Sequence, residues 1–270
     1  MTIRTVPAGN GLAWLSNGIT LMLKNPGPFI LMGLIYTIIS VVPLLGSLAL
    51  AIIGPTLYGG IAWAARRQDR GENAEVGDLF RGFQLEGKIG PLLLLCLPGV
   101  IAGVVLVILL TVVILVSLAG AGMSAAMESP AALIGAMGVG ALVLLPVMLA
   151  LGLLVFALAF FAIPDTMFVS NDAFAAMKQS MRATLANVGA VLLYLVVFVL
   201  AVVVVTGILA LISSLLAQVL VSLVAVPLAG ASMYLAWKDV YADSAAELPP
   251  APPAPETPPT PPQDGGGMVA

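Results

Sequence analysis

Four stretches of this chain contain no charged residue, and they restrict the possible folds more than any other feature. They are 41, 39, 36 and 55 residues long and cover 25–65, 89–127, 129–164 and 183–237. A helix needs about 20 apolar residues to cross a bilayer, so each stretch is long enough for one span, and the first and last for two. Only 9% of the whole chain is charged, against about 25% in soluble domains. We therefore predict an all-α integral membrane protein.

The first and last stretches each contain a break of small or helix-breaking residues. One break is "PLLGS" at 43–47, and the other is Ser213-Ser214. Dividing the stretches there predicts six transmembrane helices, arranged as three hairpins, in a membrane domain of residues 1–242. The predicted spans are about 28–45, 47–65, 90–118, 138–164, 188–212 and 215–237.

The basic residues give an independent test of this count, because cytoplasmic segments carry the excess of Lys and Arg. With six spans, all ten Lys and Arg fall on the side of the two termini, and the three opposite loops contain none. The longest opposite loop, 119–137, has Glu128 as its one charged residue. We therefore predict that both termini lie in the cytoplasm.

Three cytoplasmic segments, which precede spans 1, 3 and 5, each carry an apolar stripe at helical spacing. Long basic side chains and tryptophan favour the same membrane interface. The candidate membrane-interface residues are Leu12, Trp14, Leu15 and Ile19 in the first segment, Phe80 and Phe83 in the second, and Phe174, Met177, Lys178, Met181 and Arg182 in the third. Similar junctions follow the stripes: "NPGP" at 25–28, "KIGP" at 88–91 and "NVGA" at 187–190. This pattern predicts three repeated units, each an interfacial amphipathic helix followed by a hairpin.

The segment 66–88 is the polar exception, with ten of the chain's 23 charged residues, five of each sign. Its balanced charge is typical of a solvated face whose acids pair with Arg66, Arg67 and Arg70. The alternative is a divalent-cation site formed by the acids that recur every third residue, which are Asp69, Glu72, Glu75 and Asp78.

No motif in the sequence indicates catalysis. The chain has no histidine, which removes the commonest general base and metal ligand, and its single cysteine, Cys96, lies in an apolar run. Asp165 falls at the end of span 4 without an adjacent nucleophile, so we interpret it as a polar span terminus. We predict that the protein is not an enzyme and needs no cofactor. Its net charge is −3, and we predict that it binds no nucleic acid.

The composition changes after residue 242. Residues 249–262 include nine prolines, a composition that cannot form a packed core. We predict that residues 243–270 form a disordered cytoplasmic tail.

Several segments together resemble a family of uncharacterised proteobacterial inner-membrane proteins. They are "VPAGNGLAWLSNGITLMLKNPGPFILMGLIY", "GPTLYGGIAWAARRQDRGE", "DLFRGF" and "FAIPDTMFVSNDAFAAMKQSMRATLANVG". They are more distantly similar to YciC-type proteins and to the membrane domain of some glycerophosphodiester phosphodiesterases. The resemblance covers about residues 5–242 and implies six spans in a bacterial inner membrane. It brings no catalytic residues with it.

Two functions fit these observations. The first is a non-enzymatic membrane protein whose interfacial helices engage membrane lipids or a membrane-protein partner. The alternative is a transporter or channel for a small uncharged solute. The sequence does not indicate the oligomeric state.

Overall fold

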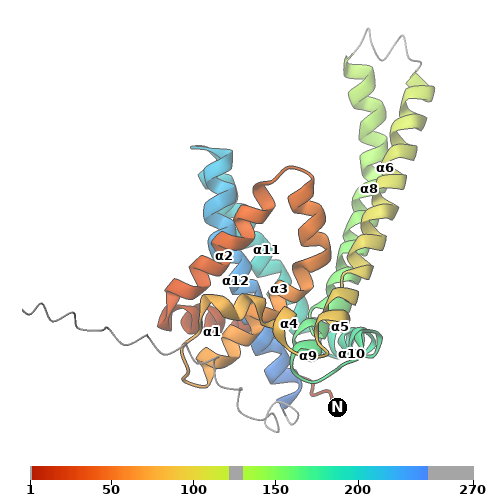
Figure 1. Cartoon of the computed structure of the whole chain (residues 1–270). Helices are drawn as coiled ribbons and strands as arrows, with labels where there is room; N and C mark the ends of the chain where they lie inside the picture. The colour runs from red at the N-terminus through yellow and green to blue at the C-terminus, as the bar shows by residue number, and fades with distance from the viewer. Residues whose placement is uncertain (1, 122–129, 243–270) are drawn as a thin grey trace, which may run out of the picture.

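The computed structural model describes residues 2–121 and 130–242, and every regular element in this part of the chain is a helix. The predicted tail and much of the loop 119–137 lie outside the described residues. Figure 1 shows the arrangement. The helices are α1 Asn10–Lys24, α2 Pro26–Val41, α3 Leu45–Asp69, η1 Val76–Phe80, α4 Arg81–Gln84, α5 Ile89–Leu94, α6 Leu97–Ala121, α8 Pro130–Ala159, α9 Ala162–Phe168, α10 Ala173–Ala186, α11 Val188–Ala210 and α12 Ser214–Val240.

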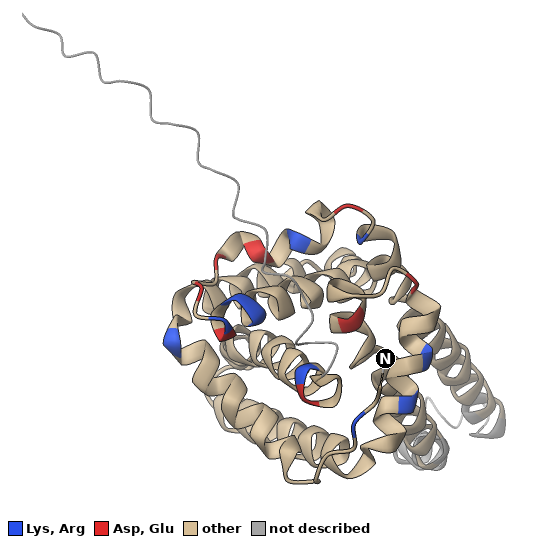
Figure 2. Ribbon diagram, turned by 90° about the horizontal axis from the view of Figure 1, so that it is seen from below, with Lys and Arg blue, Asp and Glu red and all other residues tan. Residues whose placement is uncertain are grey.

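The described residues form two levels. The base consists of α1, η1, α4, α5, α9 and α10 with the adjoining ends of α3 and α12. Above it project the pairs α2–α3, α6–α8 and α11–α12, and the α6–α8 pair stands apart, contacting α3, α9 and α10 near its lower end (Figure 1). The charged residues of the described chain lie in the base and its loops, as the coloured ribbon seen from below shows (Figure 2).

Several helices are long and apolar enough to cross a membrane, which confirms the all-helical, membrane-type class. They are Leu45–Asp69, Ile89–Val116, Leu144–Phe168, Val188–Ala210 and Ser214–Val240. The predicted span 28–45 differs from the structure: α2 has only 16 residues and qualifies only together with α1, from which it is bent by 107°. The predicted breaks near 43–47 and 213–214 correspond to the turns at 42–44 and 211–213.

Contacts between the described helices link three successive parts of the chain, called units below, into a ring. Unit 1 is residues 10–69, unit 2 is 76–168 and unit 3 is 173–240. The second half of each hairpin carries the interfacial element of the next unit: η1 and α4 pack on α3, α10 packs on α8 and α9, and α1 packs on α12. Because α12 is the last helix and α1 the first, the third contact closes the circle.

The junction residues of the three units repeat this cyclic pattern. Asn25 donates a 3.3 Å hydrogen bond from Nδ2 to the carbonyl of Ala74, just before η1. Lys88 donates a 3.0 Å bond from Nζ to the carbonyl of Ser170, just before α10. Asn187 donates a 3.0 Å bond from Nδ2 to the carbonyl of Arg4, before α1. The first residue of each junction sequence therefore donates a hydrogen bond to the backbone segment that leads into the next unit.

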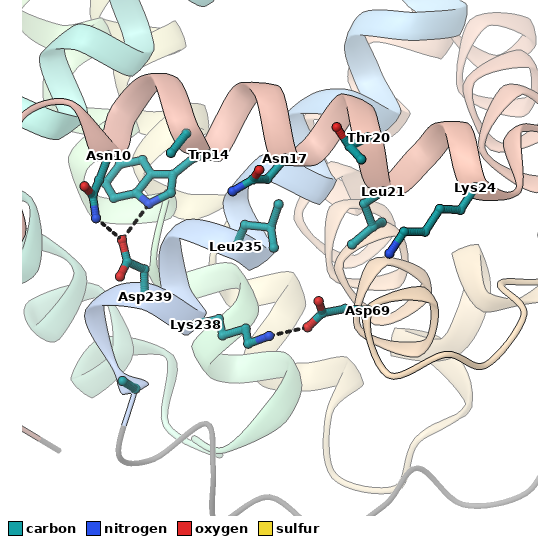
Figure 3. A pocket seen from close by; sticks show the side chains of 12 residues that line it. Asn10, Trp14, Asn17, Thr20, Leu21, Lys24, Asp69, Leu235, Lys238 and Asp239 are labelled. Atoms are coloured by element: carbon teal, nitrogen blue, oxygen red, sulfur yellow. Dashed lines mark hydrogen bonds and ion pairs between the residues drawn. The ribbon is translucent and has the colours of Figure 1, made fainter.

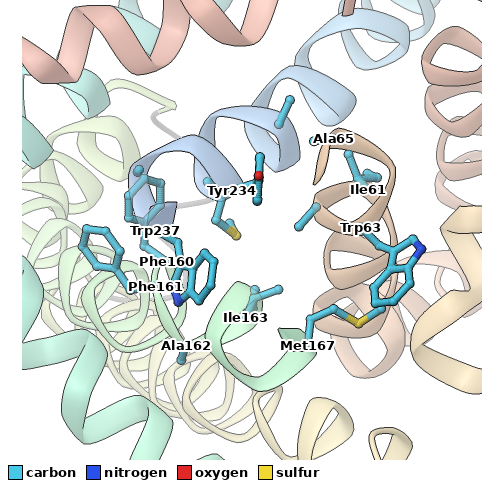
Figure 4. Packing of buried hydrophobic residues seen from close by; sticks show 14 of the residues in the cluster. Ile61, Trp63, Ala65, Phe160, Phe161, Ala162, Ile163, Met167, Tyr234 and Trp237 are labelled. Carbon is cyan, nitrogen blue, oxygen red and sulfur yellow. The ribbon is translucent and has the colours of Figure 1, made fainter. Parts of the chain in front are cut away.

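The centre of the base is filled by side chains from all three units. The guanidinium of Arg66 in unit 1 lies 5.1 Å from the ring centroid of Phe168 in unit 2. Phe168 in turn lies 5.2 Å from Trp237 and 5.9 Å from Tyr234 in unit 3. Figure 4 shows the side chains of α3, α9 and α12 directed toward one another. Phe168 therefore contacts both other units.

Candidate functional site

A pocket of about 570 Å³ opens on the base between α1 and α12, beside the end of α3. It combines charged, amide, hydroxyl and apolar side chains (Figure 3). Its lining residues are Asn10, Ala13, Trp14, Asn17, Thr20, Leu21, Lys24, Asp69, Leu235, Lys238, Asp239 and Ala242. The site therefore lies where the ring closes between the first and last helices.

Asp239 organises one end of the pocket. Its Oδ2 accepts a 2.8 Å hydrogen bond from Nδ2 of Asn10 and a 3.0 Å bond from the indole Nε1 of Trp14. The indole is buried and lies against the rings of Phe160 and Tyr194. The carboxylate thus fixes the orientation of the Trp14 ring.

Asp69 organises the other end. Its Oδ2 accepts a 2.9 Å hydrogen bond from the hydroxyl of Tyr234 and pairs with Nζ of Lys238 (Figure 3). Both carboxylates of the pocket are therefore engaged by donors from the protein itself.

Lys24 and Asn17 differ from these residues, because neither has a side-chain partner among the described residues. Lys24 is the last residue of α1, where a positive charge is favoured by the helix dipole. The pocket can therefore offer one uncommitted ammonium group and one amide to a small polar group.

The polar segment 66–88 pairs with itself, as its balanced charge predicts. Arg67 contacts Glu72 at 3.2 Å, Glu75 at 3.1 Å and Asp78 at 3.0 Å. Asp78 also accepts a hydrogen bond from the backbone N–H of Glu75, which completes a capping box at the start of η1. Burial raises the pKa of Asp78 above its ordinary value, although this N–H and Arg67 act in the opposite direction.

The alternative of a cation site gains no support from this geometry. Within residues 2–121 and 130–242, no three His, Cys, Asp or Glu side chains are grouped so as to hold a metal ion. Asp69, one of the four acids considered, points away to Tyr234 and Lys238 instead.

Asp165 lies at the end of its apolar helix as predicted, but it is buried inside the base. It is 3% exposed, and Nε1 of Trp237 is 3.5 Å from its Oδ1. Lys88 is the nearby cation: burial lowers its pKa, and the Asp165 carboxylate opposes that shift. Asp165 thus belongs to the packed interior, Lys88 is half-buried beside it, and neither lines the pocket.

The predicted interface residues divide between the surface and the interior. On α1, Leu12 and Ile19 are exposed, whereas Trp14 and Leu15 are buried. In the second segment, the predicted amphipathic helix is a short 3₁₀ turn followed by four α-helical residues. There Phe80 is exposed and Phe83 is half-buried.

The third segment forms the helix α10, and the carboxylate of Asp172 caps it by accepting hydrogen bonds from the backbone N–H groups of Phe174 and Ala175. Phe174, Lys178 and Arg182 are exposed, Met181 is half-buried, and Met177 is buried. The buried face consists mainly of small residues instead of the predicted apolar stripe: Ala173, Ala176, Ser180, Ala183 and Thr184 accompany Met177.

The model of one protein family, described as a domain of unknown function (DUF7847), matches residues 20–250. The chain belongs to this family. The DUF7847 match includes Lys24, Asp69, Lys238 and Asp239 of the pocket but begins after Trp14. No curated protein and no solved structure matches the chain.

Sequence reasoning missed the pocket residues Asn10, Asn17 and Asp239. The signal available was weak: Asp239 follows Trp237 and Lys238 at the end of the last span, where polar residues are common. Its partners lie more than 220 residues away along the chain. Only the folded structure, in which α1 packs on α12, shows that these residues line one pocket.

Proposed function

We propose that this DUF7847 protein is an integral protein of a bacterial inner membrane, with six spans and with its base and both termini in the cytoplasm. In this proposal it is not an enzyme. It engages membrane lipid or a membrane-protein partner through the outer faces of its interfacial helices α1 and α10.

The observation that carries this proposal is the outward face of these helices. Large apolar side chains are exposed there, with Ile19 at 47%, Leu23 at 69% and Phe174 at 62%. Lys24 and Lys178, on the same helices, have no side-chain partner among the described residues. Exposed apolar groups beside free basic groups are typical of helices that lie in a membrane interface.

The placement of charge supports the orientation. The helices α2, α6, α8 and α11 contain no charged residue, and the basic residues of the described chain gather at the base. Reporter fusions after residues 75 and 175 should therefore report cytoplasm, and a fusion near residue 127 should report periplasm. A periplasmic signal at residue 75 would contradict the topology.

The packed centre favours this function over solute transport. Arg66 and Trp237 both contact the ring of Phe168, so a solute that passed between the three units at this point would have to displace these side chains. Liposomes that contain the protein should accordingly release a trapped uncharged solute no faster than empty liposomes.

The direct test is the composition of what copurifies with the protein in a mild detergent. The wild-type chain should retain a stoichiometric lipid or protein partner. A variant with Ile19→Gln and Leu23→Gln should retain less, because it replaces exposed apolar groups. Ser16→Gln, a change at an exposed polar position of the same helix, is the matched control. Equal retention by all three proteins would contradict the proposal.

A further inference from the structure

A second cavity, an apolar groove of about 470 Å³, lies on the side of the molecule between α6, α8 and α10. Ile101 and Val105 of α6 form one wall, and Leu154 and Leu158 of α8 form the other. Phe174 and Lys178 of α10 lie at its lower end, and Lys178 is the one charged residue among those that line it.

The length of the groove suits one hydrocarbon chain. Along α6 it extends from Leu97 to Val105, which is about 12 Å at 1.5 Å per residue. One leaflet contributes about 15 Å to a hydrocarbon core of about 30 Å. The groove therefore covers most of one leaflet, starting from the level of the base.

The depth of the groove indicates that something apolar fills it. The α6–α8 pair stands apart from the other projecting helices (Figure 1), so lipid surrounds this pair if it crosses the membrane. Empty apolar space would lose dispersion contacts on every wall, and water would find no hydrogen-bonding partner along the walls.

The charged residues at the lower end of the groove indicate which polar group the molecule that fills the groove carries there. Lys178 has no side-chain partner among the described residues, and neither has Arg182, one turn further along α10. Residues four apart lie on the same face of a helix, and α10 contains no acidic residue. Asp172, the N-cap of α10, is the nearest acid in the sequence and is engaged by the backbone N–H groups of Phe174 and Ala175. Lys178 and Arg182 therefore offer two unpaired positive charges at this end, which complements a phosphate.

We propose that this groove holds one acyl chain of an anionic phospholipid from the cytoplasmic leaflet, with the lipid phosphate on Lys178 and Arg182. This inference rests on the proposed membrane orientation and names the lipid class that the protein engages. Neither of two other pockets has this combination. The cavity between α11 and α12 is lined by apolar residues alone, and the pocket between α1 and α12 has charges of both signs.

The test uses phosphatidylglycerol that carries a photoactivatable group in its acyl chain. The purified, delipidated full-length chain is titrated with this lipid in detergent and irradiated, and the labelled peptides are mapped. Label should concentrate in residues 97–105 of α6 and 151–158 of α8. Unlabelled phosphatidylglycerol should compete for the site better than phosphatidylcholine.

Two pairs of matched variants localise the site. Lys178→Gln should reduce labelling at subsaturating lipid about fivefold, as expected for one basic group near an anionic lipid, whereas Arg4→Gln, at an exposed basic residue outside the groove, should not. Val105→Phe should block the groove, whereas Val104→Phe, on the neighbouring exposed valine outside the groove, should not. The thermal unfolding midpoints of the four variants check that each one is folded.

The outcomes separate this proposal from the proposed function. Labelling of the groove that is lost in Lys178→Gln and Val105→Phe but kept in both controls supports the site. Label spread evenly over the apolar helices, or unchanged in these two variants, overturns it. If the groove proposal is overturned in this way but a lipid or a protein partner still copurifies with the wild-type chain, the proposed function remains supported.

Discussion

The indole Nε1 of Trp14 donates a 3.0 Å hydrogen bond to Oδ2 of Asp239, and this bond joins the first helix to the last. The same carboxylate oxygen accepts from Asn10, one turn earlier on α1. The backbone adds a third link, from the N–H of Arg4 to the carbonyl of Val240. These contacts close the ring of three units and form one end of the polar pocket.

Removing the indole donor should weaken this closure. Trp14→Phe keeps an aromatic ring against Phe160 and Tyr194 but leaves Asp239 with one donor fewer. We expect a loss of about 1.5–3 kcal/mol, in the range of hydrogen bonds to charged groups, measured by denaturant unfolding in micelles. In an Asp239→Ala background the same change should lose less stability, and equal losses in both backgrounds would show that the bond is not the cause.

Close approach of α1 and α11 depends on Gly11. A Cβ at this position would overlap the carbonyl oxygen of Ala190 and crowd the backbone N–H of Tyr194. Because backbone cannot move aside as a flexible side chain can, Gly11→Ala should destabilise the protein by about 1–3 kcal/mol. Gly9→Ala, where a Cβ would meet nothing within 4 Å, should leave the unfolding midpoint nearly unchanged. A similar loss in both variants would contradict the packing.

The junction asparagines should contribute unequally to stability. Asn187 accepts a 2.7 Å hydrogen bond from the N–H of Val6 and donates to the carbonyls of Arg4 and Ala183. Asn187→Ala leaves the partly buried Val6 N–H and Arg4 carbonyl without this partner, whereas the Ala183 carbonyl keeps the backbone N–H of residue 187, so we expect a loss of about 2–3 kcal/mol. Asn25→Ala removes one longer bond, to Ala74, and should lose about 1 kcal/mol or less. Thermal unfolding of the two variants side by side gives the comparison, and a larger effect at Asn25 would contradict it.

The carboxyl of Asp78 should make stability depend on pH. Burial raises its pKa above the ordinary value of about 3.9, so folding favours the protonated form. Its contribution to stability is fully present below the unfolded pKa and is lost as the pH rises through the folded pKa. The Asp78→Asn variant should therefore gain stability relative to the wild type between pH 4 and pH 7, measured by thermal unfolding. A wild-type advantage that grows with pH would show that Arg67 outweighs burial.

The helices and their breaks were predictable because their signals are local. Pro43 with Gly46, and the pair Ser213-Ser214, interrupt apolar runs close to the observed turns, and Asp172 caps α10. The buried faces were not predictable from apolar stripes. Lipid is as apolar as leucine, so a large apolar side chain gains little by facing protein instead of lipid, and small residues mark helix contacts instead. On α10 this places Phe174 outside and Ser180 inside.

The polar pairs were unpredictable for a different reason. The balanced charge of segment 66–88 indicated that its acidic and basic residues pair with one another. It could not show that Arg67 forms ion pairs with three acidic residues, or that Asp69 pairs with Lys238 outside the segment. Asp69 and Lys238 are 169 residues apart, and no local pattern relates them. The same holds for the junction residues, whose partners lie in other units.

The contact between α1 and α12 also sets the order in which the molecule can be completed. Trp14 and Asp239 are 225 residues apart in the chain. At about 5–20 residues per second, the ribosome needs about 10–45 s to add the second after the first. Throughout that interval α1 has no partner from the last helix, and its indole and amide donors face the growing membrane complex or water. The final helix therefore acts as the closing step of biogenesis, and a nascent chain arrested before it would hold an open arc of helices in place of a ring.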